Sequence, residues 1–155
     1  MPAVVSAQVS VQQEPFDVSA ELKAIAGGRH DIGAVASFVG LVRDLADAKL
    51  SSMTLEHYPG MTEKALIEIV EQAKQRWELL GVRVIHRYGR LAPGDAIVLV
   101  LVAGSHRGEA FAACEFIMDF LKTRAPFWKK EETPAGGRWV DARDADDAAT
   151  ARWKA

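Results

Sequence analysis

Residues 105–132, which read SHRGEAFAACEFIMDFLKTRAPFWKKEE, carry the strongest structural signal in the chain. Their apolar side chains recur at the spacing of one helix face, namely Ala110, Cys114, Ile117, Met118 and Leu121. Ala125 precedes a proline and is pushed out of helical geometry, so we expect the helix to end near residues 122–124. Four cations and no acid lie between residues 122 and 130: Lys122, Arg124, Lys129 and Lys130. A local anion site and a solvated basic face both explain this cluster.

The overall composition limits the partners of this cluster. The chain has 155 residues, of which 49% are hydrophobic and 26% charged, and the length favours a single domain over residues 1–155. A formal net charge of −2 argues against a general nucleic-acid binder, so any anion site must be local. The single cysteine excludes an internal disulfide and a multi-cysteine metal site, and no set of His, Asp and Glu has metal-ligand spacing.

The first residues lack the basic start and apolar run of a signal peptide. No segment reaches the roughly 20 apolar residues of a membrane span. We therefore expect a cytoplasmic protein without a membrane partner.

Periodicity predicts an α+β fold, in which two long helices pack on a mainly antiparallel sheet. The expected helices cover residues 17–25, 62–80 with Thr62 as N-cap, and 106–124. The expected strands cover 5–11, 33–42 with a bulge at Gly40, 53–58, 82–88 and 96–103, and a hairpin at 127–132 and 138–141. The strand within residues 1–14 and the surface tail 144–155 complete the single domain. Residues 96–103 are almost continuously apolar, as in a central buried strand.

Lys122 and Lys129 are expected to converge across the turn at Pro126, one from a helix end and one from a strand start. A lysine close to another cation loses proton affinity and becomes usable as a general acid, base or nucleophile. For either lysine alone, the simpler interpretation is a surface cation, which for Lys122 is favoured at a helix C-terminus.

Other polar residues have a functional and a structural interpretation. His106-Arg107 opens a helix, where backbone N–H groups and a guanidinium favour an anion, but a surface pair near a helix cap fits equally. Arg43 follows an apolar strand and is as well explained by solvation as by function. His57 and His86 alternate with apolar neighbours and fit structural histidines. Cys114 lies on the buried helix face, which fits an unreactive thiol.

Three segments together resemble a known family, the large, catalytic subunit of molybdopterin synthase. They are LEHYPGMTEKAL at residues 55–66, IHRYGRLAPGD at 85–95 and FIMDFLKTRAPFWKKE at 116–131. The resemblance runs from about Gly33 to Arg143, and its motifs occur in the order of the family.

The resemblance implies a sulfurtransferase of molybdenum-cofactor biosynthesis that converts cyclic pyranopterin monophosphate (precursor Z) to molybdopterin. It implies that sulfur arrives as a C-terminal thiocarboxylate on a small ubiquitin-like partner with a Gly-Gly tail, without a cofactor of the chain's own. It further implies an α/β-hammerhead-like fold with an added β subdomain, and a homodimer within a heterotetramer.

Residues are carried over from the family by position. Lys122 and Lys129 match its two active-site lysines, and His106-Arg107 match a pair that binds the anionic end of the substrate. Further substrate-pocket positions match Leu41, Val42, Arg43, Lys129, Lys130, Glu131, Phe38 and Met118. Arg143 matches an arginine from the neighbouring large subunit. Leu41 departs from the basic or polar residue common in the family, which leaves a backbone contact as its expected role.

Two other functions are compatible with the same residues. The chain could be a non-catalytic docking module for a ubiquitin-like Gly-Gly tail, with the cations binding only a carboxylate. It could also be a Schiff-base lysine enzyme acting on a phosphorylated carbonyl compound. Binding of the pterin phosphate distinguishes the first alternative, and borohydride trapping distinguishes the second.

Overall fold

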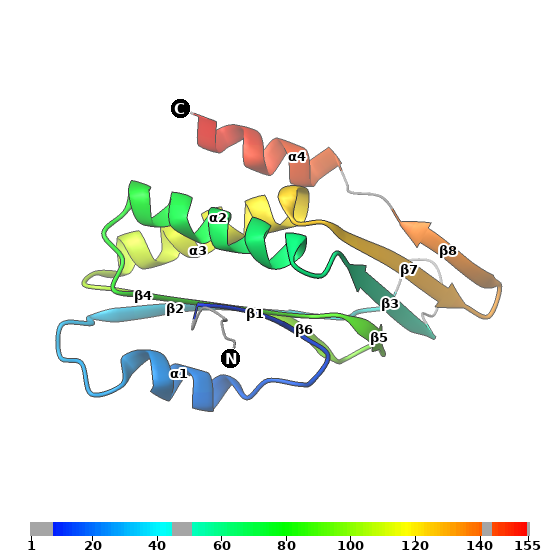
Figure 1. The fold of residues 1–155 in the computed structure, drawn as a ribbon, viewed down its shortest axis with the longest axis horizontal. Helices are drawn as coiled ribbons and strands as arrows, with labels where there is room; N and C mark the ends of the chain where they lie inside the picture. Colours follow the sequence, from blue (N-terminus) through cyan, green and yellow to red (C-terminus); the bar gives the residue numbers. More distant parts are fainter. Residues whose placement is uncertain (1–7, 45–50, 141–143, 155) are drawn as a thin grey trace.

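The computed structural model contains two four-stranded sheets, and its helices pack mainly on the first of them (Figure 1). The structure describes residues 8–44, 51–140 and 144–154. The start of the expected first strand, the end of the expected last strand at Asp141, and Arg143 lie outside the described residues.

The first sheet has the strand order β1-β4-β6-β2. Its strands are β1 (Val9–Gln12), β4 (Gly81–Arg87), β6 (Ala96–Gly104) and β2 (Ala34–Leu41). Only β1 and β4 pair in parallel; the pairs β4–β6 and β6–β2 are antiparallel. The mainly antiparallel α+β arrangement predicted from periodicity is thus confirmed.

Strand β6 has cores on both of its faces, as its apolar run predicted. Val98, Val100 and Val102 belong to the cluster that includes side chains of α2 (Met61–Arg76) and α3 (Arg107–Arg124). Leu99 and Leu101 point to the opposite face, against α1 (Val18–Ala26) and the segment before it. Figure 1 shows α1 on one side of this sheet and α2 and α3 on the other.

The second sheet has the order β5-β3-β7-β8. It consists of β5 (Gly89–Leu91), β3 (Ser52–His57), β7 (Phe127–Thr133) and β8 (Gly136–Val140). The predicted hairpin is present, although its strands run further than expected and leave a two-residue connection. The three-residue β5 was not predicted because so short a strand has no measurable alternation.

Two local details follow from backbone chemistry. The register of β2 against β6 shifts between Gly40 and Leu41, which confirms the predicted bulge. Helix α2 begins at Met61 with Gly60 as N-cap, at φ 86°, so the prediction of Thr62 as N-cap was wrong. It also ends at Arg76 rather than near residue 80, because Trp77 is extended.

Thr62 instead joins three elements. Its hydroxyl accepts a hydrogen bond from the N–H of Tyr58 at 3.0 Å and donates one to the carbonyl of Pro126 at 2.9 Å. The residue is fully buried. Thr62 therefore fixes the turn between α3 and β7 against the start of α2.

The C-terminal residues form α4 (Asp144–Ala151) and a short 3-10 helix, η1 (Arg152–Lys154). Helix α4 packs on α3, and Figure 1 shows it on the outer side of the helix layer. Many described side chains of this segment are exposed, but Trp153 packs against the main core.

We expect Thr62→Val to lower the free energy of unfolding by about 1–3 kcal/mol, because it leaves two backbone groups without their buried partner. Urea denaturation measures the change. Thr150→Val is the control, since the Thr150 hydroxyl makes one exposed bond to the Asp147 carbonyl and its loss should cost under about 0.5 kcal/mol. Equal, small effects of both substitutions would contradict this role of Thr62.

Candidate active site

Lys122 and Lys129 lie on either side of the break at Ala125-Pro126. Helix α3 ends at Arg124 and Ala125 is extended, so the predicted end of the helix is confirmed. Phe127 then begins β7. The Lys122 side chain is exposed at the end of the helix, and Lys129 follows on the strand with one third of its side chain exposed.

Successive side chains of β7 point to opposite faces of the sheet, so Lys129 and Lys130 lie on different faces. Lys129 and Glu131 lie on one face, opposite Leu55 and Met53 of β3, and their charged groups are 3.9 Å apart. Lys130 lies on the other face, where its ammonium is 3.4 Å from Glu132 and 6.0 Å from the ring of Trp139. The side chains of Lys129 and Lys130 therefore cannot hold the same small ligand within one chain.

His86 connects the two lysine-bearing elements. Its ring is 6% exposed and stacks on Phe127 with centroids 3.9 Å apart and an interplanar angle of 24°. Its Nδ1 is 2.9 Å from the carbonyl oxygen of Arg87, so Nδ1–H donates in the neutral ring. This partner confirms the structural interpretation of His86.

The pKa of His86 is lowered to about 4, mainly by burial and to a smaller extent by the charges of Lys122 and His57, against the opposing effect of the hydrogen bond to Arg87. The imidazole is thus neutral at physiological pH. It therefore adds no positive charge to those of Lys122, at the end of α3, and Lys129, near the start of β7. Sequence alternation alone could not predict the stacking of this ring on Phe127, because the contact depends on how the two sheets meet.

Arg43 follows β2, at the end of the first sheet where His86 also lies. Strand β2 is antiparallel to β6, so Leu41 lies opposite Ala96, at the beginning of β6. The N–H of buried Val42 donates to Asp95 and its carbonyl accepts from Gly94, so the Val42 backbone is already bonded. Leu41 and Arg43 are exposed beyond this point.

The two apolar pocket candidates differ in exposure. Met118 is buried and lies one helical turn before Lys122 on α3. Phe38 is 40% exposed and shares a face of β2 with Ala36, which packs in the core beneath α2 and α3.

His106 and Arg107 lie at the opposite end of α3. From Arg107 to Lys122 the helix rises about 22 Å, at 1.5 Å per residue. The His106 side chain is largely exposed, and its backbone N–H donates to Glu109 at 3.1 Å. Within one chain, the structure does not bring this pair to the lysines.

The structure also bears on the alternative of a cysteine nucleophile. Cys114 is buried, and burial together with nearby Glu115 raises the pKa of its thiol to about 11, which confirms an unreactive thiol. In the described part of the chain, no group of three His, Cys, Asp or Glu could hold a metal ion. None of the helices in that part is long and apolar enough to cross a membrane.

The fold and this end of the molecule define a class: a two-sheet α+β protein whose cationic groups, Arg43, Lys122 and Lys129, suit a small anionic ligand. A family model described as MoaE protein matches residues 11–124. The chain belongs to the MoaE protein family.

Individual relatives agree with this assignment. The chain is 63% identical over 146 residues to the molybdopterin synthase catalytic subunit of Ralstonia nicotianae, covering 94% of this chain and 83% of that protein. It matches the solved molybdopterin biosynthesis MoaE protein from Burkholderia ambifaria with a TM-score of 0.81 and 56% identity, over 96% and 99% of the two chains.

A more distant structure shares the fold alone. It is a protein–protein complex of subunits 1 and 2 of molybdopterin-converting factor from Helicobacter pylori, with a TM-score of 0.72 and 22% identity. The match covers 87% of this chain and 91% of that one.

We expect the neutral state of His86 to make stability depend on pH. The folded pKa of about 4 lies below the ordinary value of 6.5, so folding is penalised as pH falls from about 6.5 towards 4. At pH 4.5 this contribution is on the order of 2–3 kcal/mol.

His86→Phe keeps a ring that can stack on Phe127 and removes the titration. Urea denaturation at pH 7 and 4.5 should therefore show a smaller loss of stability on acidification for the variant than for the unmodified chain. The control is His30→Phe, because His30 is exposed. Identical pH dependence of His86→Phe and the unmodified chain would contradict a buried, neutral His86.

Proposed function

We propose that this chain is the catalytic subunit of a molybdopterin synthase and acts as a sulfurtransferase in molybdenum-cofactor biosynthesis. Lys122 at the end of α3 and Lys129 near the start of β7, the strand on whose first residue the neutral His86 stacks, carry the proposal. The identity of 63% to a curated catalytic subunit supports it.

The proposed substrate is cyclic pyranopterin monophosphate. Its phosphate is anionic, and Lys122, Lys129 and Arg43 supply local positive charge on a chain whose net charge is −2. Positive groups stabilise the charge that develops on the leaving oxygen as the cyclic phosphate opens. An ammonium group can also donate a proton to that oxygen.

The proposed sulfur donor is the thiocarboxylated Gly-Gly terminus of a small ubiquitin-like partner. The only cysteine is buried with a pKa of about 11, so its thiol is protonated and poorly suited to carry the transferred sulfur. A donor on another chain removes the need for a reactive cysteine here. In this proposal the chain requires no cofactor of its own, and the reaction takes place in the cytoplasm.

We also propose that a second copy of the chain completes the site, within a heterotetramer of two large and two small subunits. The rise of about 22 Å along α3 is longer than a tricyclic pterin phosphate. If His106-Arg107 binds the anionic end of the substrate handled by Lys122 and Lys129, the pair must come from the neighbouring copy. Arg143, outside the described residues, is proposed to come from that copy as well.

We expect Lys122→Ala and Lys129→Ala each to lower formation of molybdopterin at least about 100-fold, because each removes a proton donor or acceptor. The assay uses thiocarboxylated partner and pterin precursor, with mass spectrometry of the product. Lys74→Ala is the control: Lys74 lies on α2, outside the proposed pocket, and its ammonium is 3.8 Å from Glu71, so turnover should stay within about threefold.

Near-normal turnover of both lysine variants would remove them from the proposed chemistry. Titration calorimetry with the pterin phosphate tests the docking-module alternative. If the chain bound the partner but never the pterin, with or without that partner, the docking module would be the better description.

A mixing experiment tests the shared site. His106→Ala and Lys122→Ala dimers should each be inactive, and an equimolar mixture of the two should regain about a quarter of normal turnover, because half of the random pairs contain one intact site out of two. Recovery requires subunit exchange, verified by native mass spectrometry. Exchange without recovered activity would contradict a site built from two copies.

A further inference from the structure

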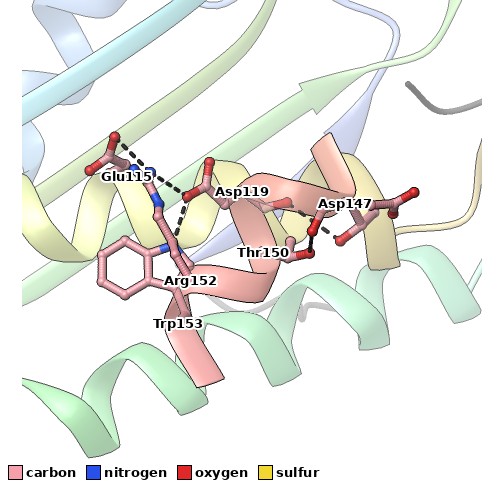
Figure 2. A network of polar contacts seen from close by, with 7 residues as sticks. Glu115, Asp119, Asp147, Thr150, Arg152 and Trp153 are labelled. Atoms are coloured by element: carbon pink, nitrogen blue, oxygen red, sulfur yellow. Dashed lines mark hydrogen bonds and ion pairs between the residues drawn. The ribbon is translucent and has the colours of Figure 1, made fainter. Parts of the chain in front are cut away.

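Arg152 and Trp153, near the C-terminal end of the chain, both bind the carboxylate of Asp119 on α3 (Figure 2). The Arg152 guanidinium lies 2.8 Å from Asp119 Oδ2, and the Trp153 indole N–H donates to the same oxygen at 2.6 Å. Arg152 also contacts Glu115, one turn earlier, at 2.8 Å. The Asp119 side chain is 15% exposed, so water screens these bonds less than it screens an ordinary surface pair.

Packing holds Arg152 and Trp153 in place; we call these two residues the anchor. The Trp153 ring makes edge-on contacts with Trp77 and Phe116, with centroids 5.8 and 5.5 Å apart. Arg76 donates to the backbone carbonyl of Trp153 at 3.0 Å. The two donors to Asp119 are thus ordered by contacts with both long helices.

Asp119 is also the acid nearest to Lys122 on the same helix. Residues three apart on a helix are neighbours on its surface, and an acid and a lysine at this spacing normally attract each other. In the described structure the Asp119 carboxylate instead binds Arg152 and Trp153, and Lys122 makes no ion pair. The other titratable groups at this end are His86 and His57, and Lys129 with Glu131.

We propose that Arg152 and Trp153 are positioning residues for the lysine site: they hold Asp119 away from Lys122 and so leave Lys122 available to an anionic substrate. The inference rests on the proposed function, in which Lys122 acts on a pterin phosphate. Without the anchor, Asp119 would pair with Lys122, stabilise its ammonium form and compete with the phosphate.

The double substitution Arg152→Ala, Trp153→Phe removes both donors and keeps an aromatic ring between Trp77 and Phe116. Acylation of the full chain by acetic anhydride, with the modification at Lys122 quantified by peptide mass spectrometry, reports how much of the Lys122 amine is unprotonated. We expect its acylation rate at neutral pH to fall about twofold, the effect of one ion pair at this spacing. The single variant Trp153→Phe should shift the rate less, in the same direction.

Replacing Asp119 by an uncharged residue in the double variant should reverse the effect on Lys122. Adding Asp119→Asn to the double variant should restore both the acylation rate and the KM for the pterin, which we expect the anchor variant to raise about twofold. Glu115→Gln is the matched control, because Glu115 loses the same arginine but lies seven residues from Lys122 and should not restore either value. A purely structural anchor predicts no rescue by Asp119→Asn.

Unchanged Lys122 acylation in the anchor variants, or failure of Asp119→Asn to restore it, would overturn the inference. Acylation that changes as expected while KM and turnover do not would support the release of Asp119 and instead contradict the proposed role of Lys122. The thermal unfolding midpoint of each variant verifies that the chain remains folded.

Discussion

The rest of this structure depends on the interruption of the backbone at Ala125-Pro126. The proline ends α3, and within two residues the chain passes from the helix layer into the second sheet. Thr62 bonds this turn to the start of α2, and His86 stacks on the first residue of β7. Helix, sheet and turn are therefore positioned by the same few contacts, and two lysines only seven residues apart are carried by different elements.

The charge at this end of the molecule depends on three cationic side chains and on a histidine that stays neutral. Arg43, Lys122 and Lys129 provide cations, while burial keeps His86 neutral beside them. On a chain with a net charge of −2, this concentrates positive potential in one region instead of spreading it over the surface. Such a distribution favours a small anion over a long polyanion.

Local rules predicted much of the fold, and non-local contacts explain the remainder. The apolar run of β6, the bulge at Gly40 and the end of α3 at Pro126 depend on nearby residues, and all three are confirmed. Thr62 was misassigned as a cap because its real partner, Pro126, lies 64 residues away.

The same limit applies to the site. Residue types and spacing identified Lys122 and Lys129 as candidates, but the stacking of His86 on Phe127 depends on how β4 of the first sheet meets β7 of the second. The contacts of Trp153 with α2 and α3 likewise have no signal in a short, charged C-terminal segment.

Helix α3 also sets a fixed distance between the residues at its two ends. It has no glycine or proline between Glu109 and Arg124 that could absorb a change in length. Deleting one residue there would shorten the helix by about 1.5 Å and turn one end about 100° relative to the other. Many side chains along this helix can change without altering the distance between its ends, but the number of residues cannot, so over evolution α3 should tolerate substitution far better than insertion or deletion.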